Sequence, residues 1–357
     1  MNFIELCNEN LNIQDNICAV SFCNKDELVI LTCTGEVLLY HLSSKKLELL
    51  FETNPNNGLK YADGGFDPTA SSSIYTMDSI IVVVNDYKKH GFVLNRKEGY
   101  RLHISRGDYH ANISKYPIAL FEAANGDPHL IYGVDWNHLQ IANLTTRQVL
   151  TADKSLIEED AEQRHIDFYK KHKESNKLLW PRGYDYFFAR LMLSPDKKSF
   201  LSAGWVWGSC DCFNLYNIED FITNHRIKHT VIGGWEHNDR GACFVDDETV
   251  AIVYNPQEEG ESDAKNAYDL RLYHTDGQGA KGIITLNPPL NLSGAELFYR
   301  TEDQNFYVFS QKIGMAVISR SGDIMFCDST FIPKRYDDEQ NLFIDYDEKR
   351  IRIFRIE

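Results

Sequence analysis

Seven residues between positions 180 and 237 have side chains of the kind that anchors binding sites. They are Trp180, Arg182, Tyr184, Trp205, Trp207, Trp235 and His237. Tryptophan, tyrosine and arginine bury a large area at a small cost in conformational entropy, so they dominate the energetics of protein interfaces. These residue types therefore predict recognition of a partner rather than cleavage of a bond.

The tryptophans also admit a structural interpretation. Trp205 and Trp207 alternate in an apolar run, so on a strand they would point to the same side and pack between neighbouring sheets. We favour packing for these two. Trp235 and His237 follow Gly233 and Gly234, which predicts a loop, and loops carry binding residues more often than strands do. For this pair both interpretations stay open.

Local motifs for catalysis or metal binding are absent from the sequence. The histidines lack the spacing of a helical zinc site, and Cys210 and Cys212 have no second ligand pair at zinc spacing. No phosphate-binding loop or nucleophile elbow occurs, and Gly277 and Gly279 lie between expected strands. The acidic segment 258–263 lacks the spacing of a calcium loop. We therefore expect neither a metal nor a cofactor.

Charge and hydropathy exclude further classes. The chain has 37 Lys and Arg against 52 Asp and Glu, a formal net charge of −15, which repels nucleic acid and anionic membrane surfaces. No apolar run approaches the ~20 residues that cross a bilayer, and residues 1–16 do not resemble a signal peptide. We expect a soluble, cytoplasmic, monomeric protein whose eight cysteines are reduced.

A repeat organises most of the chain. Residues 17–51 contain four short apolar runs separated by polar turns, which is typical of one propeller blade. The pattern recurs in 74–104, 116–150, 184–232, 242–286 and 295–326. Three more runs follow, at 331–333, 342–346 and 351–356, and one run at 2–6 precedes the first unit. If the N-terminal run completes the last sheet, no edge stays open. The sequence thus predicts an all-β, seven-bladed β-propeller forming a single domain over 1–357.

The segment Leu191-Met192-Leu193-Ser194-Pro195-Asp196, followed by strands, resembles WD40-type repeats, although the Gly-His and Trp-Asp dipeptides of that family do not recur. Together with Tyr184-Asp185-Tyr186-Phe187, Gly204-Trp205-Val206-Trp207 and Gly234-Trp235-Glu236, it resembles a group of uncharacterised bacterial WD40-like proteins over residues 115–275. This resemblance implies a scaffold for protein contacts and brings no activity with it.

The long connections predict which face binds. Residues 52–73, 151–186, 233–241 and 255–267 all join strands at the same face of a propeller, and insertions gathered on one face usually mark the binding face. Within the longest insertion, about 152–186, Ser155 and Glu158 form a capping-box pattern that predicts a helix over 156–174. We expect its apolar stripe of Ile157, Ala161, His165 and Phe168 to pack against the ring.

The sequence therefore favours a non-enzymatic module that binds a protein partner with a basic surface through the long-loop face. The alternative is a propeller enzyme of the hydrolase or lactonase type, with a metal or carboxylate site at the mouth of the central channel. Such a site draws its residues from several blades and leaves no local motif.

Overall fold

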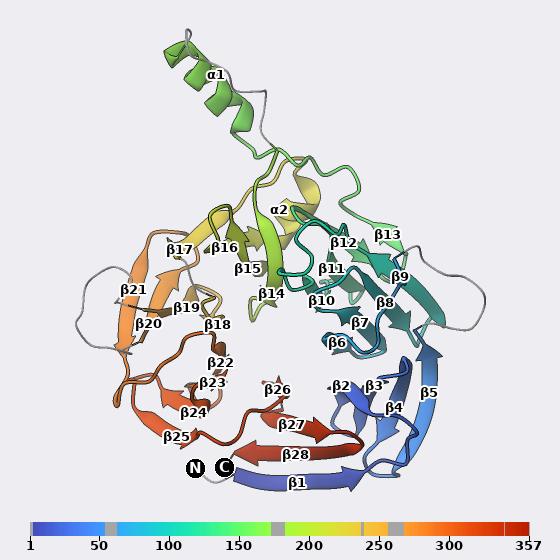
Figure 1. Cartoon of the computed structure of the whole chain (residues 1–357). Coiled ribbons are helices and arrows are strands. Elements are labelled where there is room, and N and C mark those ends of the chain that lie inside the picture. The colour runs from blue at the N-terminus through green and yellow to red at the C-terminus, as the bar shows by residue number, and fades with distance from the viewer. Residues whose placement is uncertain are drawn as a thin grey trace.

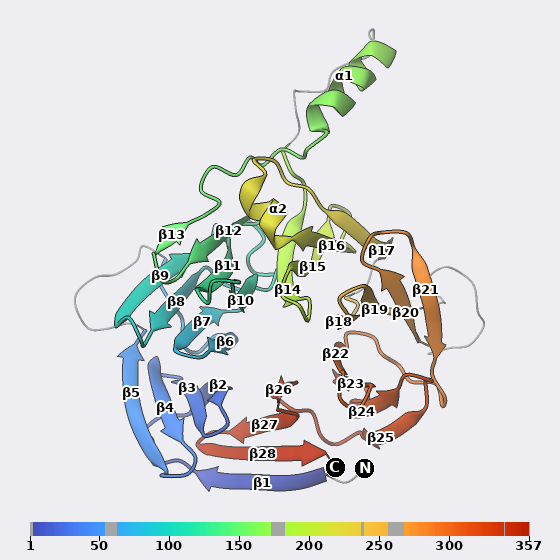
Figure 2. The same cartoon turned by 180° about the vertical axis from the view of Figure 1, so that it is seen from behind.

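The computed structural model describes residues 3–53, 63–172, 183–236, 239–255, 268–338 and 340–356. Within these residues, seven four-stranded antiparallel sheets stand around one axis (Figure 1), and the view from behind shows the same closed ring (Figure 2). The protein is a seven-bladed β-propeller, as the repeat pattern predicts.

Each blade runs from its innermost strand outward. The first contains β2 (Ile17–Asn24), β3 (Glu27–Thr32), β4 (Glu36–His41) and β5 (Lys46–Glu52). The second contains β6 (Ser72–Met77), β7 (Ile80–Asn85), β8 (His90–Asn95) and β9 (Tyr100–Ser105). The third contains β10 (Ile118–Glu122), β11 (Pro128–Asp135), β12 (His138–Asn143) and β13 (Gln148–Val149). The fourth contains β14 (Phe187–Leu193), β15 (Ser199–Val206), β16 (Cys210–Asn217) and β17 (Thr230–Glu236).

The remaining blades follow the same order. The fifth contains β18 (Ala242–Asp246), β19 (Thr249–Tyr254), β20 (Asp269–His274) and β21 (Ala280–Thr285). The sixth contains β22 (Glu296–Arg300), β23 (Asn305–Ser310), β24 (Gly314–Ser319) and β25 (Ile324–Asp328). The seventh contains β26 (Arg335–Asp337), β27 (Leu342–Asp347), β28 (Arg350–Ile356) and, as its outermost strand, β1 (Phe3–Asn10).

The N-terminal strand closes the ring, as expected. β1 pairs antiparallel with β28 from Phe3 opposite Ile356 to Asn10 opposite Arg350, with one irregularity between Glu5 and Cys7. Closure removes the exposed edge that the three-stranded C-terminal sheet would otherwise present. The first and last strands of the described chain are thereby joined in one sheet.

The core lies between the blades. In β7, β19 and β23 every residue is buried, because both faces of these second strands are covered by neighbouring sheets. Such strands read as continuous apolar runs rather than alternating ones. In the outermost strand β5, by contrast, four of the seven residues are exposed and only Phe51 is buried. This gradient from axis to rim is the reason that the blades were visible in the sequence.

The last blade differs from the prediction at its innermost strand. Residues 331–333 are not a strand; β26 lies at Arg335–Asp337 instead. In β26 only Tyr336 is buried, between a half-buried arginine and a half-buried aspartate. The polar composition of β26 does not predict a strand, whereas the apolar residues 331–333 do.

Two helices accompany the described strands. α1 spans Ala161–Lys171, so the expected helix exists but begins later than predicted. Ser155 accepts a hydrogen bond from the backbone of Ile157 and does not cap a helix, because Glu158 pairs with Ile227 in a parallel bridge. α2 (Ile218–Thr223) has no counterpart in the prediction; Asn217 caps it by accepting from the backbone of Asp220.

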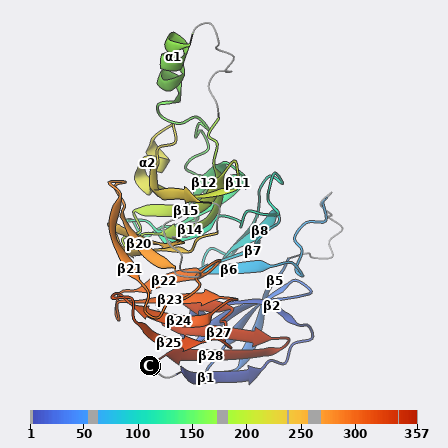
Figure 3. The same cartoon turned by 60° about the vertical axis from the view of Figure 1, so that its left-hand side comes forward.

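The expectation that α1 packs its apolar stripe against the ring is wrong. No residue of α1 is buried, and Phe168 is exposed. Figures 1 and 3 show α1 projecting from the outer rim. The start of α1 is tied to the residues after α2: Glu162 in its first turn forms an ion pair with Arg226.

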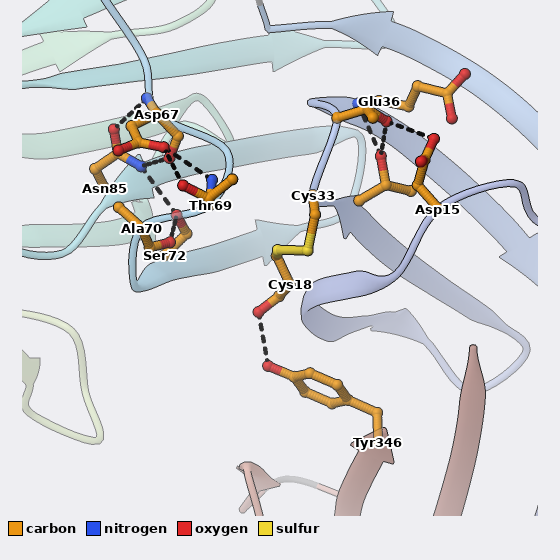
Figure 4. The surroundings of a disulfide bond; sticks show 12 residues. Asp15, Cys18, Cys33, Glu36, Asp67, Thr69, Ala70, Ser72, Asn85 and Tyr346 are labelled. Carbon is orange, nitrogen blue, oxygen red and sulfur yellow. Dashed lines mark hydrogen bonds between the residues drawn. A yellow bond between two sulfur atoms is a disulfide. The ribbon is translucent and has the colours of Figure 1, made fainter. Parts of the chain in front are cut away.

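Two of the eight cysteines are not free thiols. Cys18 in β2 and Cys33 after β3 form a disulfide across the innermost pair of strands (Figure 4). The carbonyl of Cys18 also accepts a hydrogen bond of 2.9 Å from the Tyr346 hydroxyl of the last blade. The prediction of eight reduced cysteines is therefore wrong for this pair. Neither helix that the structure describes is long and apolar enough to cross a membrane.

Candidate functional site

We use the name long-loop face for the side of the ring on which each blade connects to the next and each second strand connects to the third. It carries the connections 106–117, 136–137 and 207–209, in addition to the longer ones that the sequence predicts. The opposite face has short turns in most blades, with the exception of the connection 218–229 that contains α2. The unequal lengths agree with the prediction from the sequence.

Six rings meet on this face between the third and fourth blades, and we call them the aromatic cluster: Tyr109, His110, Trp136, Phe187, Trp205 and Trp207. Phe187 and Trp205 are register partners in β14 and β15, and their rings stack 3.6 Å apart at an interplanar angle of 7°. Trp207 stands edge-on to Phe187, with centroids 5.0 Å apart. The other rings of the cluster pack around this stacked pair.

Three apolar side chains of this region face solvent. Tyr109 is 49% exposed, Trp207 is 50% exposed, and Ile113 in the same connection as Tyr109 is 57% exposed. The rings of Tyr109 and Trp207 lie 6.3 Å apart. Apolar surface of this kind, grouped rather than scattered, marks contact sites in soluble proteins.

His110 lies against the other rings of the cluster. Its ring is edge-to-face with those of Tyr109, Phe187, Trp205 and Trp207, at centroid distances of 4.4 to 5.7 Å. Its backbone has a φ of +54°, a left-handed conformation that is uncommon for residues other than glycine. The surrounding packing must hold this conformation, because it costs of order 1 kcal/mol or more.

A buried arginine holds the connection that presents Tyr109 and Ile113. Arg106 is only 7% exposed, and its guanidinium lies 4.7 Å from the centroid of the Tyr116 ring. Burial lowers the pKa of Arg106 to about 10, although the side chain still carries its charge at neutral pH. Its hydrogen bonds run to four backbone carbonyls, from Nε to Lys88 and from Nη2 to Asp86, Ala111 and Ser114, at 2.8 to 3.1 Å.

A second contact joins the connection to the fourth blade. The indole N–H of Trp205 donates to Ser114 Oγ at 2.8 Å. Gly107 N–H donates to the carbonyl of Val134 at 2.9 Å, which links the connection to the third blade as well. Tyr109 and Ile113 therefore stand on a connection that hydrogen bonds hold to the second, third and fourth blades.

A polar pocket of about 510 Å³ adjoins the same connection on the side of the second blade. In it, Asp63 lies 2.6 Å from Lys89 Nζ and 2.9 Å from His90 Nε2, and His90 Nδ1 lies 2.9 Å from His103 Nε2. Hydrogen bonds from Lys89 and His90 hold the pKa of Asp63 well below its usual range. Burial lowers the pKa of His103, and the neighbouring His90 lowers it further. This chain of side chains ties residues 63–68 to the second blade.

The seven residues singled out in the sequence have different surroundings. Tyr184 is buried: its hydroxyl lies 2.5 Å from that of Tyr216 and accepts from Asn214 Nδ2 at 3.1 Å, so it belongs to the core. Trp205 and Trp207 lie in the aromatic cluster, and the exposed Trp207 does not pack between sheets. Trp180, Arg182 and His237 lie outside the described residues.

Trp235 is separate from the cluster. It is 60% exposed, but it lies on strand β17 and not in the loop that the neighbouring glycines predict. The end of β17 is fixed by Arg240, which is bound at 2.6 to 2.8 Å by Asp211 and Glu236. Among the described residues, no ring contact joins Trp235 to the aromatic cluster.

Several residues of the site escape sequence reasoning. Tyr109 comes from the connection between the second and third blades, Trp136 from a turn within the third blade and Phe187 from the innermost strand of the fourth, and nothing in their spacing links them. The segment Asp108-Tyr109-His110 carried the one available signal, an aromatic pair in a long connection ahead of an innermost strand. His90 and His103 are 13 residues apart on neighbouring strands, which is no recognised ligand spacing.

Comparison with known proteins gives no assignment. Protein-family models were scanned and none matches this chain. A search of curated proteins also finds no match. Within the described ranges, no group of three or more histidine, cysteine, aspartate or glutamate side chains is placed to hold a metal ion.

Proposed function

We propose that this propeller is a protein-interaction module that binds its partner through the long-loop face, with the aromatic cluster as the anchor. The observation that carries the proposal is the exposure of three apolar side chains: Tyr109 and Ile113, on the connection that Arg106 holds from within, and Trp207 of the fourth blade, whose ring lies 6.3 Å from that of Tyr109. Rigid, exposed aromatic residues bind with little loss of conformational entropy. Hot-spot residues of this type contribute about 2 to 4 kcal/mol each.

The chemistry of the surface favours a basic partner. The chain has a net charge of −15, which attracts a positive surface at long range. At short range, the faces of tyrosine and tryptophan bind lysine and arginine side chains through cation–π contacts of about 0.5 to 2 kcal/mol. Asp108 precedes Tyr109 in the chain, and its exposed carboxylate lines the adjoining polar pocket. A lysine- or arginine-rich segment of a protein fits these features.

The test compares matched variants in capture from cells of the source organism. Tyr109→Ala with Trp207→Ala removes two exposed rings, whereas Leu49→Ala with Ile283→Ala removes equally exposed apolar side chains of the outer rim. A third variant replaces residues 161–171 by a Gly/Ser linker and tests the insertion separately. We expect one protein with a basic surface to be retained by wild type and by the rim variant and lost by the cluster variant.

The affinity of the purified partner for the wild type and for each variant is then measured. Two hot-spot residues at about 2 kcal/mol each correspond to a loss of affinity of roughly 1000-fold. Equal affinity of the wild type and the cluster variant would refute the proposal. Loss in the linker variant alone would move the binding site to α1.

A further inference from the structure

Two arginines near the ring axis have guanidinium groups without a hydrogen-bond partner. Arg190 lies on β14 and Arg335 on β26, both innermost strands (Figure 1), and both side chains are half-buried. Within the described part of the chain, neither guanidinium makes a hydrogen bond or an ion pair. A guanidinium carries five N–H donors and binds carboxylate or phosphate in a two-pronged geometry. These donors are available to a ligand.

Both arginines reach toward another blade. The guanidinium of Arg190 lies 5.2 Å from the ring centroid of Phe298 in β22, and that of Arg335 lies 5.8 Å from the ring centroid of Tyr75 in β6. The Phe298 ring in turn lies 5.3 Å from that of Tyr336, the neighbour of Arg335. Arg190 thus reaches from the fourth blade to the sixth, and Arg335 from the seventh blade to the second.

A carboxylate stands among these cations. Glu296 precedes Phe298 by two positions on β22, so both side chains lie on the same side of that strand. Crowding by neighbouring groups disfavours the charged form of Glu296 although its side chain is exposed, but Arg190, Lys115 and Arg335 more than compensate and lower its pKa. No described cation lies within 4.0 Å of Glu296. The carboxylate thus shares the field of the arginines without filling their hydrogen-bonding positions.

The other charges of this region are largely engaged. Lys115 Nζ lies 3.8 Å from Asp86, whose carboxylate also accepts from the hydroxyls of Ser71 and Ser73. Burial raises the pKa of the Cys243 thiol; Arg190 lowers this pKa, and Asp338, which follows β26, raises it. The region is therefore not strongly positive overall. Free donors, rather than net charge, single out Arg190 and Arg335.

We propose that Arg190 and Arg335 bind an oxyanion, a phosphate or carboxylate group, at the ring axis, and that Glu296 limits the affinity of this site. The site differs from the aromatic cluster in its residues and its chemistry, although Arg190 shares strand β14 with Phe187 of the cluster. The long-range field of an acidic protein repels anions, so binding depends on the two guanidiniums directly. A ligand that accepts hydrogen bonds from both guanidinium groups replaces water there, and no hydrogen bond between described residues has to break.

The experiment measures binding of inorganic pyrophosphate and of citrate by calorimetry to the purified full chain. The variants are Arg190→Gln, Arg335→Gln and Glu296→Gln. Arg147→Gln is the matched control, because Arg147 lies 4.5 Å from the Tyr100 ring centroid at the rim, in a similar cation–π contact. Circular dichroism and a thermal melt of each variant confirm the fold.

We expect at least one of the two probes to bind to the wild type. Its affinity should fall ~10-fold or more in Arg190→Gln and in Arg335→Gln. The affinity should be unchanged in Arg147→Gln and several-fold higher in Glu296→Gln. Preference for pyrophosphate assigns the site to phosphate, and preference for citrate assigns it to carboxylate. No binding of either probe to wild type and Glu296→Gln, or equal binding to Arg147→Gln and both axial variants, overturns the proposal.

Discussion

Replacing Arg106 tests how the binding connection is held. Arg106→Met preserves much of the apolar stem but removes four hydrogen bonds to the carbonyls of Lys88, Asp86, Ala111 and Ser114. A hydrogen bond to a charged group contributes about 1.5 to 3 kcal/mol when its partner is buried. Removal of the buried charge returns several kcal/mol of desolvation free energy. We therefore expect the free energy of unfolding to fall by about 2 to 4 kcal/mol.

Arg106→Lys separates charge from geometry. Lysine keeps the charge but offers a single ammonium group, which cannot reach carbonyls on both sides of the guanidinium plane. We expect a smaller loss of about 1 to 2 kcal/mol, so the order of stability is wild type, Arg106→Lys, Arg106→Met. Arg101→Met is the control, because Arg101 is an exposed arginine with a single hydrogen bond, to the carbonyl of Glu52.

The assay combines urea unfolding with amide hydrogen exchange. Besides the global loss, the amides of Ala111 and Ser114, which donate within the connection, should exchange faster in Arg106→Met than in wild type. An unfolding free energy within 0.5 kcal/mol of wild type, together with unchanged exchange at these two amides, would refute the role that we assign to Arg106. Equal losses in Arg101→Met and Arg106→Met would refute it as well.

Three further predictions concern the ring. A thiol titration of the denatured, unreduced protein should find six free thiols among its eight cysteines, and eight would contradict the disulfide. Replacing Cys18 and Cys33 by serine should lower the free energy of unfolding by about 3 kcal/mol, because the disulfide closes a 15-residue loop. Burial lowers the pKa of His229, so the unfolded chain takes up its proton first and stability should fall from pH 7 to 5; His229→Gln should flatten that decline, and parallel curves would argue against it. Phe3→Ala should lower the free energy of unfolding by about 2 kcal/mol, because the half-buried ring packs on other rings near the last blade. Leu6→Ala, at an exposed position of the same strand, should lower it by less than about 0.5 kcal/mol. Equal losses in the two variants would contradict a role of Phe3 in closing the ring.

The blades follow from the sequence because the physics that forms them is local. A run such as Ile80 to Val84 has neighbours on both faces and is uniformly apolar, and turns such as 194–198 begin with residues that favour chain reversal. Closure by β1 follows from counting strands, since a three-stranded last blade requires a fourth. β26 fails this reasoning because it has three residues of which only Tyr336 is buried, so it contains no apolar run.

The aromatic cluster does not follow from the sequence, because its residues meet only through the closed ring. Trp207 was visible as a candidate, but Tyr109 and Trp136 lie 98 and 71 positions before it (207 − 109 and 207 − 136). Tyr184 belongs to the same residue class as Tyr109, yet it is buried while Tyr109 is exposed. Residue type alone cannot distinguish an aromatic anchor from an aromatic core residue, since both gain by burial.

The most direct test of the proposed binding surface is site-specific photo-crosslinking in cells of the source organism. A photoreactive phenylalanine derivative replaces Tyr109 or Trp207 in the aromatic cluster, and Leu49 or Ile283 at the rim as controls. Our account predicts one covalent adduct of discrete mass from both cluster positions, to a lysine- or arginine-rich segment of a single protein, and none from the rim. Adducts from all four positions alike, or none from the cluster, would contradict it.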